Sequence, residues 1–145
     1  MHPMSFGSSK LANYLETLNQ DGLKHLLEIA VDLVYEKYKN DSRAEEAIFK
    51  WKTLHFPIDE NYASNLKSIA QQEDNEYLRL ENAGANKDEY ERHYCLMWLF
   101  TGLSDLFQLK SIVHMPVYDI LYAFMASTNE PDIYIRDLEK KIFSE

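Results

Sequence analysis

Apolar residues recur at spacings of three and four along most of the chain, which is the pattern of amphipathic helices. The clearest stripe predicts a helix over residues 20–38 and contains Leu23, Leu26, Leu27, Ala30, Leu33, Val34 and Tyr38. Similar stripes predict helices that begin after Ser8 or Ser9, after Asp41 or Ser42, after Asp59, near Lys87, at Pro116 and at Pro131. The pattern therefore predicts six to seven helices.

The residues that start and stop helices agree with this division. Asp41, Asp59 and Asn86 precede apolar stripes and can cap them, and Gly84 occupies a favourable position for ending a helix. Only four glycines and four prolines interrupt the chain, and no Asn-Gly or Asp-Gly turn joins two alternating runs. We therefore expect a single all-α bundle over residues 1–145, with residues 1–7 as an irregular N-terminal tail.

The helix predicted over residues 87–109 has the most apolar centre. Residues 94–100 contain no charge and present apolar side chains around the whole circumference, so we expect this helix at the middle of the bundle. Gly102 within it suggests a close crossing with another helix. Residues 71–76, which have almost no apolar content, are compatible with an exposed helical turn or with a hinge.

The net charge of the chain disfavours some classes of binding partner. With 24 acidic and 15 basic residues the net charge is −9, which disfavours nucleic acid and anionic membranes and mildly favours a basic protein. The longest uncharged apolar run falls far below the ~20 residues of a membrane span. The single cysteine excludes an internal disulfide, so we expect a cytoplasmic protein.

Sequence motifs of the common enzyme and cofactor sites are absent. The chain has no nucleophile elbow, phosphate loop, dinucleotide fingerprint or zinc signature, and its histidines lack the spacing of a di-iron bundle. We therefore predict a protein that is not an enzyme and uses no metal or cofactor.

One stretch is strongly acidic. Residues 73–91 contain seven acidic against two basic residues, together with two tyrosines. The simpler interpretation is a pair of solvated helix ends, and the alternative is a docking surface for a basic protein, because complementary charge and aromatic anchors are typical of interfaces. The candidate partner-binding residues are Glu73, Asp74, Glu76, Tyr77, Asp88, Glu89, Tyr90 and Glu91.

A second candidate site follows one face of the helix at 87–109. Glu89 and His93 are four residues apart, and the same face continues to Thr101 and Asp105. These four residues could bind a small ligand or perform acid–base chemistry if the face lines a cavity. The alternative is that this polar face simply meets water.

The residues thus favour a non-enzymatic protein-binding module. In size, acidity and lack of catalytic motifs the chain is similar to bacterial immunity proteins, which implies an inhibitor that neutralises a basic, nuclease-like toxin. The main alternative is a bundle with a ligand or acid–base site on the fifth helix. A homo-oligomer that uses Tyr118 and Tyr122 as interface is also compatible with the sequence.

Overall fold

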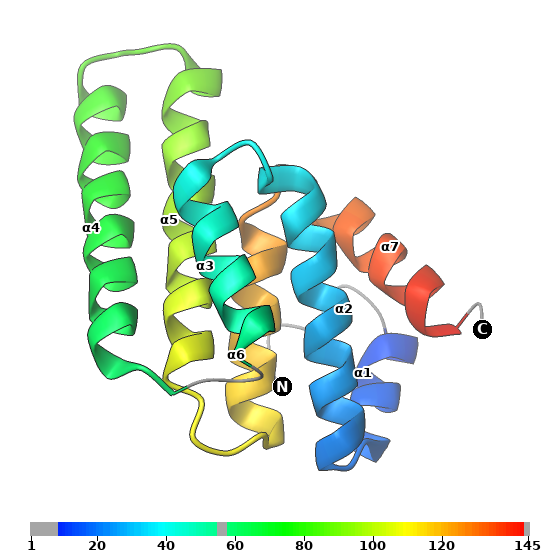
Figure 1. The fold of residues 1–145 in the computed structure, drawn as a ribbon. Helices are drawn as coiled ribbons and strands as arrows, with labels where there is room; N and C mark the ends of the chain where they lie inside the picture. The colour runs from blue at the N-terminus through cyan, green and yellow to red at the C-terminus, as the bar shows by residue number, and fades with distance from the viewer. Residues whose placement is uncertain (1–8, 55–57, 144–145) are drawn as a thin grey trace.

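The computed structural model describes residues 9–54 and 58–143 and contains only helices within them (Figure 1). The expected all-α bundle is confirmed. The predicted N-terminal tail lies outside the described residues. The helices are α1 (Ser9–Thr17), α2 (Gln20–Tyr38), α3 (Ser42–Thr53), α4 (Glu60–Asn82), α5 (Lys87–Phe107), α6 (His114–Ala126) and α7 (Pro131–Phe143).

Side-chain caps begin several of these helices where the sequence predicts them. Asp41, Asp59 and Asn86 each accept a hydrogen bond from a backbone N–H of the first turn of α3, α4 and α5. Pro116 lies in the first turn of α6, and Pro131 is the first residue of α7. The boundaries are therefore set locally, by the residues at each helix end.

α4 is continuous through residues 71–76, so this segment is helix and not a hinge. The helix ends at Asn82, and Gly84, two residues beyond it, has a φ of 74° in the left-handed region. The N–H of Gly84 donates to the carbonyl of Glu81 at 3.1 Å, and that of Ala85 donates to Leu80 at 3.0 Å. This pair of bonds satisfies the last carbonyls of α4 and turns the chain directly into α5.

The carboxyl-terminal half of α5 forms the centre of the core, as expected. Phe100 and Phe107 are fully buried, together with Trp51 of α3 and Phe124 of α6. A Cβ atom at Gly102 would lie 2.8 Å from the ring of Phe124, so only glycine permits this close approach of α5 and α6. The close crossing predicted from Gly102 is confirmed.

The amino-terminal half of α5 differs from the expectation of a fully buried helix. It forms a hairpin with α4 that projects beyond the ends of α3 and α6 (Figure 1), and α4 packs chiefly against α5. Tyr94 is 38% exposed for this reason, and Trp98 is only partly buried. Although α4 and α5 have 23 and 21 residues, no helix among the described residues is long and apolar enough to cross a membrane.

Candidate docking surface

The eight acidic and aromatic residues predicted to bind a partner all lie on the α4–α5 hairpin, but the fold separates them. Glu73 lies inside, between the helices. Glu76 and Glu89 lie around Arg79 on one side, and Asp88 is exposed in the first turn of α5. Tyr77 and Tyr90 meet on another side, with Asp74 and Glu91 near them in helical register.

Glu73 is only 8% exposed and is the centre of a partly buried ionic network. Its Oε2 atom lies 2.5 Å from Nδ1 of His93 on α5, and its Oε1 atom lies 3.1 Å from Nη1 of Arg43 on α3. Arg43 also pairs with Asp41 and places its guanidinium 4.8 Å from the centroid of the Phe100 ring. Glu73 therefore holds α3, α4 and α5 together and offers little surface to a partner.

The acids around Arg79 are partly neutralised within the chain. The guanidinium of Arg79 forms a two-pronged ion pair with the carboxylate of Glu76, with Nε donating to Oε2 at 3.0 Å. This hydrogen bond lowers the pKa of Glu76 and raises that of Arg79, to which the charge of Glu89 also contributes. This side of the hairpin has less uncompensated negative charge than the sequence suggests.

A continuous run of aromatic rings covers the opposite side, and we call it the tyrosine face. Adjacent ring centroids are 5.8 Å apart for Tyr90–Tyr77, 5.2 Å for Tyr77–Tyr94, 6.5 Å for Tyr94–Trp98 and 5.5 Å for Trp98–Tyr122. Most of these pairs meet edge to face, the arrangement that aromatic rings prefer. The tyrosine face thus consists of Tyr77, Tyr90, Tyr94, Trp98 and Tyr122 and joins α4, α5 and α6.

Carboxylates flank the tyrosine face. The hydroxyl of Tyr77 donates to Oε2 of Glu81 at 3.0 Å, and this hydrogen bond raises the pKa of Tyr77. Asp74 precedes Tyr77 by one turn, and Glu91 precedes Tyr94 by one turn, so both carboxylates lie in register with the rings. Lys87, one turn before Tyr90 and Glu91, is a basic residue in register with these side chains on α5. The surface is therefore aromatic and predominantly acidic.

The sequence interpretation missed Tyr94, Trp98, Tyr122 and Glu81 as parts of this surface. Tyr90, Tyr94 and Trp98 are spaced four residues apart, which was the available signal for a shared helix face. Tyr122 could not be added by spacing because it lies on α6. Tyr118, which the oligomer interpretation placed at an interface, is buried and donates to Oε1 of Glu16 at 2.9 Å.

The polar stripe of α5 is largely the seam between α5 and α4. Ser104 is buried and donates to the carbonyl of Ala63 on α4 at 2.8 Å. His93 also contacts α4, because it pairs with Glu73 there. Thr101 donates to the carbonyl of Met97 at 2.8 Å within α5. Glu89 is exposed. The stripe is neither an open polar face nor one enclosed pocket.

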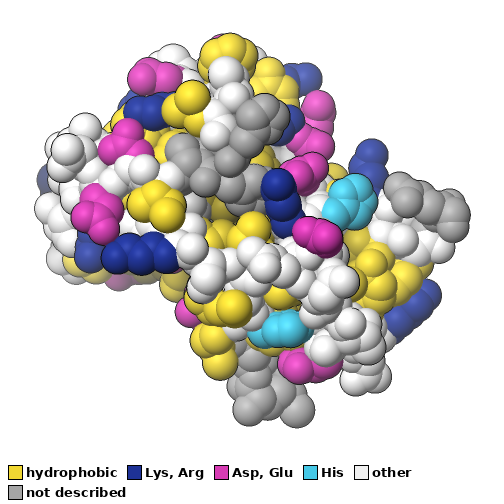
Figure 2. All heavy atoms as spheres, turned by 60° about the horizontal axis from the view of Figure 1, so that its bottom comes forward, with side chains coloured by type: hydrophobic (Ala, Val, Ile, Leu, Met, Phe, Trp, Pro, Cys, Tyr) yellow, Lys and Arg dark blue, Asp and Glu magenta, His cyan; other side chains and the backbone are white. Residues whose placement is uncertain are grey.

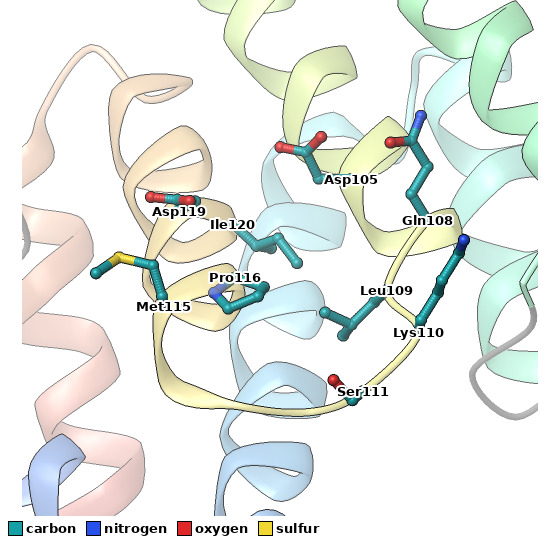
Figure 3. A pocket seen from close by; sticks show the side chains of 9 residues that line it. All are labelled: Asp105, Gln108, Leu109, Lys110, Ser111, Met115, Pro116, Asp119 and Ile120. Carbon is teal, nitrogen blue, oxygen red and sulfur yellow. The ribbon is translucent and has the colours of Figure 1, made fainter.

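Asp105, the last candidate of the stripe, lines a separate pocket of about 400 Å³ at the turn between α5 and α6 (Figure 3). Gln108 and Lys110 lie on the α5 side, and Asp119 lies on α6. Burial, and then the charge of Asp119, raises the pKa of the Asp105 carboxyl. Glu89, His93 and Thr101 do not line this pocket, so the structure does not bring the four candidate ligand-binding residues together.

The end of the bundle opposite the hairpin tip has a different electrostatic character. Figure 2 brings this end forward and shows basic side chains interspersed with acidic ones among hydrophobic groups. Lys50 lies 3.2 Å from Asp59, and Lys110 lies 3.6 Å from Glu60. Charges of both signs compensate one another here, in contrast to the surroundings of the tyrosine face.

The described residues contain no group of three or more His, Cys, Asp or Glu side chains that could hold a metal ion.

Cys95 is buried with its Sγ 3.7 Å from Oδ1 of Asn129, and burial raises the pKa of its thiol. A buried thiol with a raised pKa is a poor nucleophile.

Comparison with protein-family models, with curated proteins and with solved structures finds no match to this chain.

Proposed function

We propose that this protein is a non-enzymatic binding module that docks a basic partner protein on the tyrosine face. The observation that supports the proposal is a run of five aromatic rings flanked by carboxylates, of which four lie on the projecting α4–α5 hairpin (Figure 1) and the fifth, Tyr122, lies on α6. Tyrosine and tryptophan anchor interfaces because they present a large, rigid contact area with few rotatable bonds.

The surroundings of these rings also favour a protein partner over a small ligand. The rings lie along three helices, and Leu78 (44% exposed) and Tyr94 (38% exposed) add apolar surface at the hairpin. A stable protein–protein contact needs roughly 800 Å² from each partner, so a partner would have to cover the tyrosine face together with the surface around it. The net charge of −9 would attract a basic partner and accelerate its association.

The most specific form of the proposal is an inhibitor of the immunity type. A basic, nuclease-like toxin carries a positive cleft for phosphates, and an acidic projecting hairpin can cover such a cleft and exclude its substrate. The support for this form is the acidity, the shape of the hairpin and the compositional similarity to bacterial immunity proteins.

A ligand or acid–base site along α5 has less support, because its four candidate residues do not share a cavity. Glu89 is exposed, His93 is engaged by Glu73, and Thr101 is bonded within its own helix. Asp105 alone lines the pocket at the α5–α6 turn.

The proposal is tested by capture from a native extract with matched variants. Tyr94→Ala and Trp98→Ala should lose a basic protein that the unmodified chain retains, whereas Phe49→Ala should retain it. Phe49 is 70% exposed on α3, so its substitution removes an aromatic ring away from the tyrosine face. The captured protein is then purified, and its affinity for all four chains is measured at several salt concentrations.

Two results would refute the proposal. One is equal affinity of the purified partner for Tyr94→Ala, Trp98→Ala and the unmodified chain. The other is that Phe49→Ala weakens binding as much as they do. If the partner is a nuclease, addition of the unmodified chain should abolish its activity, and Tyr94→Ala should do so only at higher concentration.

A further inference from the structure

At three other places in the described residues, an aromatic ring, a carboxylate and a basic side chain lie together. Arg43 lies 4.8 Å from the centroid of the Phe100 ring and pairs with Glu73. Lys50 lies 3.9 Å from the ring centroid of Tyr62 and 3.2 Å from Asp59.

Lys52 repeats the arrangement, since it lies 5.7 Å from the ring centroid of Tyr35 and pairs with Asp32. In each of the three cases the cation is attracted by the ring face and by the carboxylate together. In all three groups the cation comes from α3, and the ring comes from α5, α4 or α2.

The tyrosine face has the rings and the carboxylates of this arrangement, but no basic side chain of the described residues stands over its rings, although Lys87 lies one turn before Tyr90. Among residues 9–54 and 58–143, no Lys or Arg lies over the rings of Tyr77, Tyr90, Tyr94, Trp98 or Tyr122. Glu81 is held beside Tyr77 by a hydrogen bond, and Glu91 lies one turn from Tyr94. A cation supplied from outside the chain would complete the group.

We propose that the tyrosine face binds arginine side chains of the partner protein, an inference that rests on the proposed function above. A guanidinium can stack on a ring and direct its N–H groups to a nearby carboxylate, as Arg43 does with Phe100 and Glu73. The successive rings provide several stacking positions along the hairpin. The partner segment would therefore be rich in arginine and not merely positive.

Lysine fits this surface less well for a physical reason. Its ammonium is a compact and strongly hydrated charge, whereas guanidinium is planar and more weakly hydrated. A surface that acted through net charge alone would not distinguish the two. Discrimination between arginine and lysine at equal charge is therefore the decisive measurement.

The probes are two short synthetic peptides of equal length and charge, in which arginine or lysine alternates with serine. Binding to the full chain is followed by nuclear magnetic resonance of the backbone amides and of the Trp98 indole. We expect the arginine peptide to bind about tenfold more tightly than the lysine peptide and to shift signals of the tyrosine face. Tyr94→Ala, which leaves the charge unchanged, should remove most of this difference, and Phe49→Ala should preserve it.

Equal affinity of the two peptides, or shifts located away from the tyrosine face, would overturn the inference. The same holds if Tyr94→Ala retains the full preference for arginine. A native partner that still depends on Tyr94 and Trp98 would then leave the proposed function standing without the arginine inference. A native partner that ignores both residues would remove the proposed function itself, whatever the peptides do.

Discussion

Two groups of tyrosines in this chain have opposite surroundings. Tyr38, Tyr118 and Tyr134 each donate a hydroxyl hydrogen bond to another part of the bundle: to the carbonyl of Ser127 at 2.5 Å, to Glu16 at 2.9 Å and to the carbonyl of Ala30 at 3.1 Å. The tyrosines of the tyrosine face instead contact one another and Trp98, and the hydroxyl hydrogen bond of Tyr77 to Glu81 stays within α4.

The difference shows how one residue type serves two purposes. A buried phenol must find an acceptor because an unsatisfied hydroxyl in the interior is costly, so the first group fixes the packing of α1, α2, α6 and α7. The second group satisfies no such need of the fold. Its rings are available for contacts that the isolated chain does not make.

The strongest test of this comparison is truncation of one tyrosine from each group. Tyr134→Ala should lower the free energy of unfolding by about 3–5 kcal/mol, because it opens a cavity between α7 and α2 and leaves the Ala30 carbonyl without its bond. Tyr94→Ala should cost about 1 kcal/mol or less, since the ring is half-exposed. Chemical denaturation measures both, and comparable losses would contradict the division.

The same contrast applies to two acids of the hairpin. Glu73→Ala should cost about 2–3 kcal/mol, because it leaves Arg43 and His93 without their shared partner in a largely buried position. Glu91→Ala, at a partly exposed position, should change stability by no more than about 0.5 kcal/mol. Glu73→Gln serves as the control that keeps the shape of the side chain, and an unchanged midpoint in Glu73→Ala would show that the network contributes nothing.

The helices and their ends could be predicted because their determinants are local. The apolar stripe over residues 20–38 predicted both ends of α2. Gly84 predicted the turn after α4, and Gly102 predicted the close crossing of α5 with another helix. In each case the signal lies within a few residues of the feature that it predicts.

The site could be predicted only in part, because its determinants lie on different helices. Glu73 follows Leu66 and Ala70 on the buried stripe of α4, but its partner Arg43 lies on α3, and no spacing connects the two. The uncharged run of residues 94–100 indicated burial, yet burial requires a neighbouring helix. Among the described aromatic rings, that of Tyr94 meets only the rings of Tyr77 on α4 and Trp98 on its own helix, and it stays 38% exposed.

Alkaline pH should destabilise the fold through the first group of tyrosines. Burial raises the pKa of Tyr38, Tyr118 and Tyr134 above the ordinary value of about 10. The folded state therefore holds these protons more tightly than the unfolded chain, and stability present below pH ~10 declines as the pH rises above it. At neutral pH the free energy of unfolding of Tyr134→Phe should be about 1 kcal/mol lower than that of the unmodified chain. Above pH ~10 it should decline less steeply, and the two slopes should differ by up to about 1.4 kcal/mol per pH unit. Denaturation at several pH values between neutral and strongly alkaline measures both slopes, and equal slopes would show that Tyr134 is not coupled to folding.

The smallest effect concerns an acid at the other end of α5. Unlike that of Glu73, the carboxylate of Asp105 has no hydrogen-bond or ion-pair partner among the described residues, and burial raises its pKa. A raised carboxyl pKa means that the charged form weakens the fold, so this cost is absent at low pH and grows as the pH rises through the pKa of the folded state. Asp105→Asn should therefore raise the melting temperature by about 1–2 °C at neutral pH and by less in acid. A lower melting temperature of Asp105→Asn at neutral pH would mean that the Asp105 carboxylate stabilises the α5–α6 turn. The contrast between Glu73, which has partners, and Asp105, which has none for its carboxylate, would then be wrong.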